Sequence, residues 1–266
     1  MTGGNDPLLA DGPGAPARRL ARGITWLGVV LFWVVVVILA RPVGLPLYDA
    51  ILLAVLLAAV PVFSMAQLPL IEGVLIDRRS AYWSSIVTLW ILGTACWFVG
   101  TRDMGAAAVG LVGLAPAPLV LWSVGLTLAG MLVIALFRPI VSWAGGEDSR
   151  LLRQLLPRTR RERQVFALLA VAAGGSEELA YRGYAIPVLA PLIGTFGAAV
   201  LTTVVFGILH GYQGRLGILR TGVMGGVLAW GFLASGSLWP PIIAHTLIDL
   251  LAGIVFGERL LASRES

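Results

Sequence analysis

Long apolar stretches dominate this sequence and restrict what it can fold into. A helix needs about 20 mostly apolar residues to cross the hydrocarbon core of a bilayer. The chain is 58% hydrophobic and 12% charged, whereas soluble domains carry about 25% charged residues. The sequence therefore predicts an all-α, polytopic transmembrane helical bundle of about eight helices. The expected spans are 23–40, 50–71, 81–101, 118–137, 164–186, 195–213, 217–234 and 238–256.

The remaining segments divide the chain into four expected regions. Residues 1–22 are rich in Gly, Pro and Ala and end in arginines, which predicts a disordered basic N-terminal tail. N-terminal transmembrane helices follow over 23–117, and the apolar, Gly- and Ala-rich stretch 104–117 is expected to be interfacial or re-entrant. The core is expected over 118–256 and a cytoplasmic tail over 257–266. The single cysteine excludes a disulfide framework within one chain and a cysteine-based zinc site.

The arginines predict the orientation of the chain. All 19 basic residues are Arg, and with eight spans all but Arg41, Arg102 and Arg182 fall on the side of both termini. The positive-inside rule then makes both termini cytoplasmic. The use of Arg without Lys, with abundant Ala, Gly, Val and Leu, is typical of a GC-rich bacterial genome. We therefore expect a multi-pass protein of the bacterial plasma membrane, with anionic lipid rather than nucleic acid as the partner of its positive charge.

Within the largest basic loop, residues 150–157 read RLLRQLLP. On a helix the four leucines form one stripe beside two arginines, which favours a short amphipathic helix on an anionic leaflet. A solvated basic loop that serves only orientation explains the same residues equally well.

An adjacent acid pair, Glu177 and Glu178, lies inside the fifth apolar stretch. Residues four apart share a helix face, so Glu178 should meet Arg182, while Glu177 projects over Tyr181 without an ion-pair partner in its own helix. Glu177 is therefore a candidate general base. The small residues before it, 174–176, should let another backbone approach closely. A structural salt bridge between helices would explain the acids equally well if no other ionisable group joined them.

The only two histidines, His210 and His245, also lie in apolar stretches. Phe206 precedes His210 by one helical turn, and Asp249 follows His245 by one turn. A lone histidine in a helix is more often structural. Four ionisable groups on three membrane helices, however, indicate a functional site, because such groups are costly in lipid.

The expected helix boundaries do not place all of these side chains at the same depth in the membrane. At about 1.5 Å per residue, Glu177 lies roughly 20 Å from the inner face. His245 lies roughly 10 Å from the outer face by the same count, which agrees in a core of ~30 Å. His210, however, falls near the cytoplasmic end of its expected span. Either the boundaries are wrong by about two turns or these helices are tilted or broken.

Three motifs carry a resemblance to a known family. The segments EELAYR, FGILH and HTLID occur in this order on successive apolar stretches. They resemble the motifs of the CAAX-protease and bacteriocin-processing (CPBP, Abi) family of intramembrane proteases, over residues of about 118 to 256. Each motif alone is weak, but the ordered set is specific.

The resemblance implies an intramembrane endopeptidase acting on a membrane-embedded or lipidated peptide, such as a CAAX-like or prenylated one. It implies that Glu177 and His210 activate water and that His245 and Asp249 stabilise the oxyanion. It also implies that Glu178 and Arg182 hold their helix in shape, with Phe206 and Tyr181 supporting the site. Many members have Asn in place of Asp249. Because an ionised Asp cannot donate a hydrogen bond, Asp249 is expected to be protonated, to orient His245 or to bind a metal.

The cofactor expectation stays between none and a single divalent metal such as zinc. The side chains of Glu177, His210, His245 and Asp249 would be an adequate set of zinc ligands, and the family has been described both as metalloproteases and as glutamate proteases. The chain has no H-E-x-x-H helix, and the chemistry slightly favours Glu177 as a base without metal.

Two other function classes fit the same residues. A proton- or metal-coupled membrane transporter could use the acids and histidines as a relay, but it predicts an inverted repeat, and none is apparent. A non-catalytic membrane scaffold or immunity protein would keep its function after Glu177→Gln, whereas a hydrolase would not.

Overall fold

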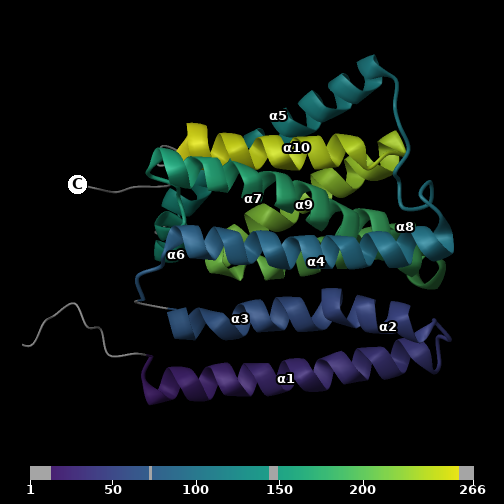
Figure 1. Cartoon of the computed structure of the whole chain (residues 1–266), viewed down its shortest axis with the longest axis horizontal. Coiled ribbons are helices and arrows are strands. Elements are labelled where there is room, and N and C mark those ends of the chain that lie inside the picture. The colour runs from purple at the N-terminus through teal and green to yellow at the C-terminus, as the bar shows by residue number, and fades with distance from the viewer. Residues whose placement is uncertain (1–12, 72–73, 144–148, 258–266) are drawn as a thin grey trace, which may run out of the picture.

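The structure is a computed structural model that describes residues 13–71, 74–143 and 149–257. Within these residues it is built of helices without strands, as the sequence predicts (Figure 1). The label η marks π-helical segments, except η3, which is a 3-10 helix. The elements are α1 Ala15–Ala40, α2 Leu47–Ala54, η1 Val55–Ala59, α3 Val60–Ile71, α4 Arg78–Met104, α5 Pro116–Trp143, α6 Arg150–Gln154, α7 Arg160–Glu178, η2 Leu179–Ala185, α8 Ile186–Leu209, η3 Gly211–Gln213, α9 Arg215–Ser235, α10 Trp239–Leu250 and η4 Leu251–Val255.

The chain is a multi-pass membrane protein. Six helices of the described residues are long and apolar enough to cross a bilayer, and Trp239–Val255 is a shorter apolar helix. The expected spans 164–186 and 195–213 fall in one of the six, the continuous stretch Arg160–Leu209. Large apolar side chains are exposed all along the bundle, as expected of surfaces that face lipid tails; examples are Trp26, Trp90, Leu121, Phe196 and Trp230.

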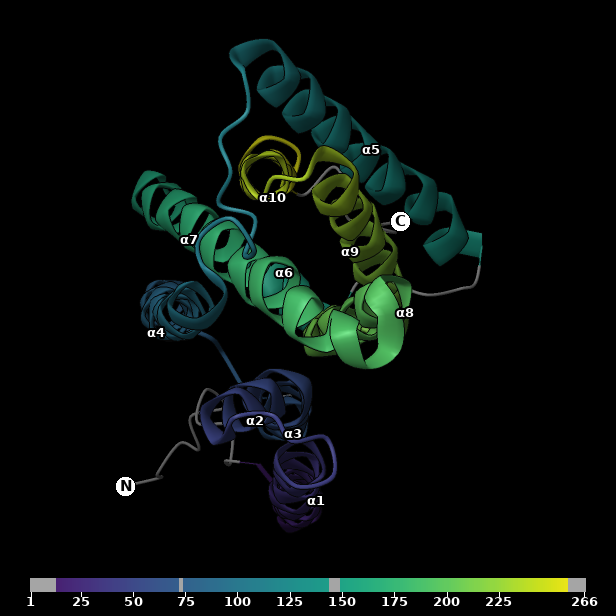
Figure 2. The same cartoon turned by 90° about the vertical axis from the view of Figure 1, so that its right-hand side faces the viewer.

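The helices form two groups when the bundle is viewed along its length (Figure 2). The first group is α1 with α2 and α3. In the second, α10 lies between α7 and α5, α9 packs on α8 and α5, and α4 packs on α7. In Figure 1 the beginning of α1 and the end of α10 lie at the same end of the bundle.

The first helix begins earlier than expected. Residues 15–22 were assigned to a disordered tail, but they form the first turns of α1, with a proline at the start of the helix. Proline is well suited to the first helical turn, and Ala, Leu and Arg are strong helix formers. The helix therefore includes Arg18, Arg19 and Arg22. The first twelve residues of the predicted tail and residues 258–266 lie outside the described residues.

A bend at Gly194 separates two of the expected spans. Here φ is 76°, a backbone conformation that favours glycine. The preceding helix continues to this bend instead of ending at residue 186, and the next one ends at Leu209 instead of residue 213. Along the chain Glu177 and His210 are almost equally far from Gly194, at roughly 25 Å of helix on either side. The corrected boundaries therefore bring His210 to the level of Glu177.

The expected interfacial or re-entrant stretch is an ordered connection between α4 and α5. Its residues 105–115 form turns and extended backbone that pack on the beginning of α10, where the Leu238 amide donates to Gly110 O at 2.7 Å. The Ser237 hydroxyl donates to Val112 O at 2.7 Å. Because this connection covers it, α10 starts inside the bundle, which explains why it is short.

The basic loop contains a shorter helix than expected. Ser149 caps α6, which ends at Gln154. The chain therefore leaves the helix at residue 155, two residues before Pro157. The four leucines are half-buried. The Ser149 hydroxyl donates to Tyr212 O in η3, so this loop packs against the bundle near His210.

Candidate active site

Four elements meet around the acid pair in the interior of the second helix group. The end of α7 and the following η2 carry the acids and Arg182, the end of α8 carries Phe206 and His210, and α10 carries His245 and Asp249. The fourth element, α9, contributes the backbone of Gly225. All three motifs of the sequence are thus in one region of the bundle.

Two small residues set the helix spacing that brings the acids to α10. A Cβ on Gly174 would come within 2.9 Å of Ile242 O, so α7 and α10 are nearly in backbone contact there. Further along, a Cβ on Gly183 would lie 2.9 Å from Leu238 Cδ2. Glu177 and His245 are each roughly 10 Å of helix away from this second contact. The two antiparallel helices therefore place Glu177 and His245 at the same level.

Glu178 is the most enclosed charge of the site. Its side chain is 0% exposed, and Oε1 accepts hydrogen bonds from Arg182 Nη1 at 3.0 Å and from His245 Nδ1 at 2.8 Å. Arg182, at 1% exposure, also donates from Nη2 to Gly225 O at 2.8 Å. Its guanidinium lies 4.4 Å from the centre of the Phe206 ring. Glu178 therefore links α7 to α10, in addition to the expected pair with Arg182.

Glu177 faces the site without a hydrogen-bond partner among the described residues. Its side chain is 12% exposed, and Oε2 lies 3.8 Å from His245 Nε2. Glu178 Oε2 also makes no hydrogen bond, but it is fully enclosed, whereas Glu177 can be reached. Glu177 is thus the acid that a water molecule or a substrate could approach.

His245 lies between the three carboxylates. Its Nδ1 donates to Glu178, and its Nε2 is directed to the other two acids, 3.8 Å from Glu177 Oε2 and 3.6 Å from Asp249 Oδ2. Both of these distances exceed hydrogen-bond length. The ring is therefore oriented by Glu178, which the sequence did not indicate, and Asp249, 32% exposed, is close to the ring without being bonded to it.

His210 follows α8 as its C-terminal cap. Nδ1 makes a 2.8 Å hydrogen bond with Phe206 O, and because a carbonyl oxygen can only accept, Nδ1 carries the hydrogen. In the neutral ring Nε2 is then an acceptor. The Phe206 ring contacts both histidines, with centroid distances of 4.7 Å to His210 and 6.0 Å to His245. No hydrogen bond within the described chain joins His210 to Glu177.

Comparison with known families agrees with this arrangement. Residues 161–251 match the family model described as Type II CAAX prenyl endopeptidase Rce1-like. This segment of the chain is similar to the CAAX protease family. No curated protein and no solved structure matches the chain.

The CAAX protease match contains every candidate residue from Glu177 to Asp249 and leaves α1–α5 outside it. It begins later than the region expected from the motifs, about 118. The match supports intramembrane endopeptidase activity in general. The helices outside it nevertheless contact the site.

Contacts from α2 and α3 are the part of the site that sequence reasoning missed. The Tyr184 hydroxyl of η2 donates to Asp49 Oδ1 at 2.6 Å, and the Tyr181 hydroxyl donates to Leu56 O at 3.3 Å. Ser64 donates to Leu209 O at 3.0 Å, just before His210. No spacing rule relates these positions, because more than a hundred residues separate each pair. Asp49 is buried.

The expected metal ligands do not form a metal site in this structure. In residues 13–71, 74–143 and 149–257, no group of three or more His, Cys, Asp and Glu side chains is arranged to hold a metal ion. The hydrogen bond from Nδ1 of His245 to Glu178 leaves Nε2 of the same ring free, beside Glu177 and Asp249.

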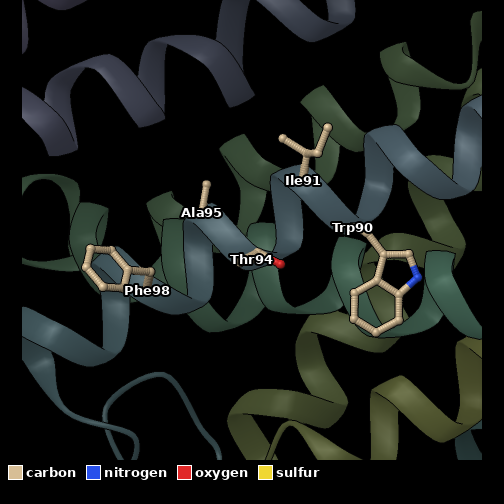
Figure 3. Close-up of a pocket in the computed structure, with 5 residues that line it drawn as sticks. All are labelled: Trp90, Ile91, Thr94, Ala95 and Phe98. Carbon is tan, nitrogen blue, oxygen red and sulfur yellow. The ribbon is translucent and has the colours of Figure 1, made fainter.

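An apolar hollow lies elsewhere, along one side of α4 (Figure 3). It contains no titratable side chain, and Figure 3 shows its residues spread along a single helix. This hollow belongs to the lipid-facing surface, not to the acid site. Its lining residues are Trp90, Ile91, Thr94, Ala95 and Phe98.

Proposed function

We propose that the chain is an intramembrane endopeptidase in which Glu177 and His210 activate a water molecule. The observation that carries this proposal is the free Glu177 carboxylate facing His245, while Oε1 of its enclosed neighbour Glu178 holds both His245 and Arg182. A buried acid without a partner needs a function or a ligand. Water is the simplest ligand that would bridge it to an imidazole.

In this mechanism Glu177 takes a proton from water while the water oxygen bonds to the carbonyl carbon of the scissile peptide. The Nε2 atom of His210 accepts the second hydrogen bond of that water. When the C–N bond of the tetrahedral intermediate breaks, the proton held by Glu177 passes to the leaving nitrogen. General acid–base catalysis of this kind contributes about 10²- to 10⁴-fold to a rate. His245, which is oriented by Glu178, stabilises the negative charge that develops on the carbonyl oxygen.

We propose as substrate a membrane-embedded or lipidated peptide, CAAX-like or prenylated. The site lies among membrane helices, so a substrate held in the bilayer can reach it laterally. The matched family is described as a prenyl endopeptidase, which supports the same class. We also propose the bacterial plasma membrane as the location, with both termini cytoplasmic and anionic lipid bound at the arginine-rich end.

We further propose that hydrolysis requires no metal. Support comes from the Glu177 carboxylate, which makes no hydrogen bond within the described residues and is therefore available to take a proton. Glu177 alone can supply the base.

The test uses purified protein in liposomes and fluorescent membrane-anchored peptides, with and without a prenyl group, and maps the cut by mass spectrometry. We expect cleavage by the wild type, unchanged by a chelator. For His210→Ala we expect a loss of about 10²-fold or more. Absence of cleavage of every membrane peptide by well-folded wild type would refute the function. Loss on chelation with recovery on adding zinc would refute the metal-free mechanism alone.

A further inference from the structure

A tyrosine that no motif includes lies next to the catalytic groups. Tyr212 belongs to η3, the short helix directly after His210, and the two rings are 5.8 Å apart between centroids. Its backbone is held from outside the site, because the Ser149 hydroxyl donates to Tyr212 O. The position of this side chain is therefore fixed from the loop that precedes α7.

A chain of hydrogen bonds fixes the direction of its phenolic proton. Gln213 Oε1 accepts from Arg220 Nη2 at 3.1 Å and from Thr221 Oγ1 at 3.1 Å. An arginine can only donate, so the amide oxygen of Gln213 must face Arg220 and the amide nitrogen must face the other way. That nitrogen donates to the Tyr212 hydroxyl oxygen at 3.2 Å.

The consequence is a free donor next to His210. Since the Tyr212 oxygen already accepts from Gln213, its O–H is left to donate, and within the described residues no group accepts it. Glu177 Oε2 is an acceptor without a donor among the same residues. An unused donor and an unused acceptor in one enclosed region indicate that a polar ligand belongs between them.

Burial keeps the phenol of Tyr212 protonated. Burial raises the pKa of Tyr212 to about 12, the hydrogen bond from Gln213 opposes this rise, and the negative charges of Asp249 and Glu177 add to it. Arg220 acts in the lowering direction. A phenol with a raised pKa is a neutral donor at physiological pH.

Hydrolysis of a peptide needs such a donor. The carbonyl oxygen gains negative charge as water adds, and preorganised donors stabilise it. An ionised Asp249 only accepts hydrogen bonds, so in that form it cannot be the donor to the oxyanion. We propose that Tyr212 is a catalytic residue, donating its phenolic hydrogen bond to the oxyanion of the tetrahedral intermediate, and that Gln213 is the positioning residue that aims it. This inference rests on the proposed function. The phenolic proton stays on Tyr212, and its hydrogen bond to the carbonyl oxygen forms as the oxyanion develops.

The experiment compares Tyr212→Phe with wild type in the liposome cleavage assay. Phe keeps the ring and removes only the donor. We expect kcat to fall about 100-fold, the loss typical of one oxyanion-hole donor, with KM little changed. The matched control is Tyr48→Phe, which removes a hydroxyl from an exposed ring in α2 and should leave kcat unchanged.

A second variant, Gln213→Leu, tests the aiming of the phenol without removing it. We expect a smaller fall in kcat, and no further fall when it is combined with Tyr212→Phe, because both changes act through one donor. Wild-type kcat in either folded single variant would overturn the inference while leaving the endopeptidase proposal intact. A wild type that cleaves no peptide would instead refute the proposed function. If Tyr212→Phe does not fold, the kcat of Gln213→Leu tests the inference in its place.

Discussion

Arg182 is among the largest fully buried side chains of the described residues, and it explains how two adjacent acids can exist inside a membrane protein. Taking a charge out of water costs several kcal/mol, and this cost is offset only by close and well-bonded partners. Arg182 has three such partners: the carboxylate of Glu178, the carbonyl of Gly225 and the face of Phe206. With Glu178 neutralised in this way, Glu177 is left for chemistry.

The first prediction concerns this ion pair. Arg182→Met should lower the free energy of unfolding by roughly 3–5 kcal/mol, because it leaves the Glu178 charge enclosed without its guanidinium. The double variant Glu178→Gln with Arg182→Met should recover part of that loss and remain inactive, since His245 loses its anchor. Denaturation in detergent measures both, and Arg160→Met at the exposed start of α7 is the control. Equal stability of the single variant and wild type would contradict a structural role.

At this scale the sequence predicts contacts within a helix and misses those between helices. The spacing of four residues predicted the Glu178–Arg182 pair, which is present at 3.0 Å. The bond from His245 to Glu178 joins residues 67 positions apart, and no local rule encodes it. Tyr212 and Gln213 gave no signal either, because a polar pair between glycines is typical of an ordinary turn.

Among the elements, the close packing of α7 against α10 is what forms the site. Their near-contact at Gly174 leaves no room for a side chain, whereas a Cβ on the adjacent Gly175 would meet nothing within 4 Å. The same two helices carry Glu177 and His245, so their separation sets the 3.8 Å between those side chains.

The second prediction uses this difference between neighbours. Gly174→Ala places a methyl group 2.3 Å from Thr246 Oγ1 and 2.9 Å from Ile242 O, which forces the helices apart and costs typically 1–3 kcal/mol. We expect cleavage to fall at least tenfold, since small misplacements of catalytic groups are costly. Gly175→Ala should be close to wild type in both respects. Cleavage rates and melting temperatures of the two variants measure this, and similar behaviour would show that the close approach is unimportant.

The bend at Gly194 is an element boundary that the sequence does not predict. Pro191 and Gly194 are typical helix breakers, yet the helix continues past Pro191 and bends only at Gly194. Hydropathy is uniform across the bend, so the number of spans could be predicted but not the residue at which one ends. The π-helical segments η2 and η4, directly after Glu178 and shortly after Asp249, also lack a sequence signal, although such segments are frequent at functional sites.

Over the whole molecule, the all-α class and the membrane location follow from composition and the lengths of the apolar stretches. The packing of α1–α3 against the site does not, because it depends on single hydrogen bonds such as Tyr184 to Asp49. The family match begins after these helices, yet α3 and the π-helical segment before it contact both η2 and the residue preceding His210. We therefore interpret them as part of the catalytic framework and not as an anchor alone.

The third prediction concerns orientation. With the buried Cys96 changed to Ser, single cysteines at Leu75 and Ala107 lie on the connections at opposite ends of α4. If the arginine-rich end is cytoplasmic, a membrane-impermeant maleimide should label Ala107→Cys in intact cells and Leu75→Cys only after permeabilisation. Both positions are exposed, so burial would not prevent labelling. The reverse pattern would contradict the predicted orientation.

The cleavage rate of Glu177→Gln tests the central claim most directly. Gln preserves size and polarity but cannot take a proton, so we predict a fall of at least about 10²-fold with the melting temperature unchanged. Glu162→Gln, the same change in the same helix, should cleave normally, because Gln retains the capping interaction at Thr159. Wild-type cleavage by a folded Glu177→Gln protein would contradict the account, since the account assigns the proton transfer from water to Glu177.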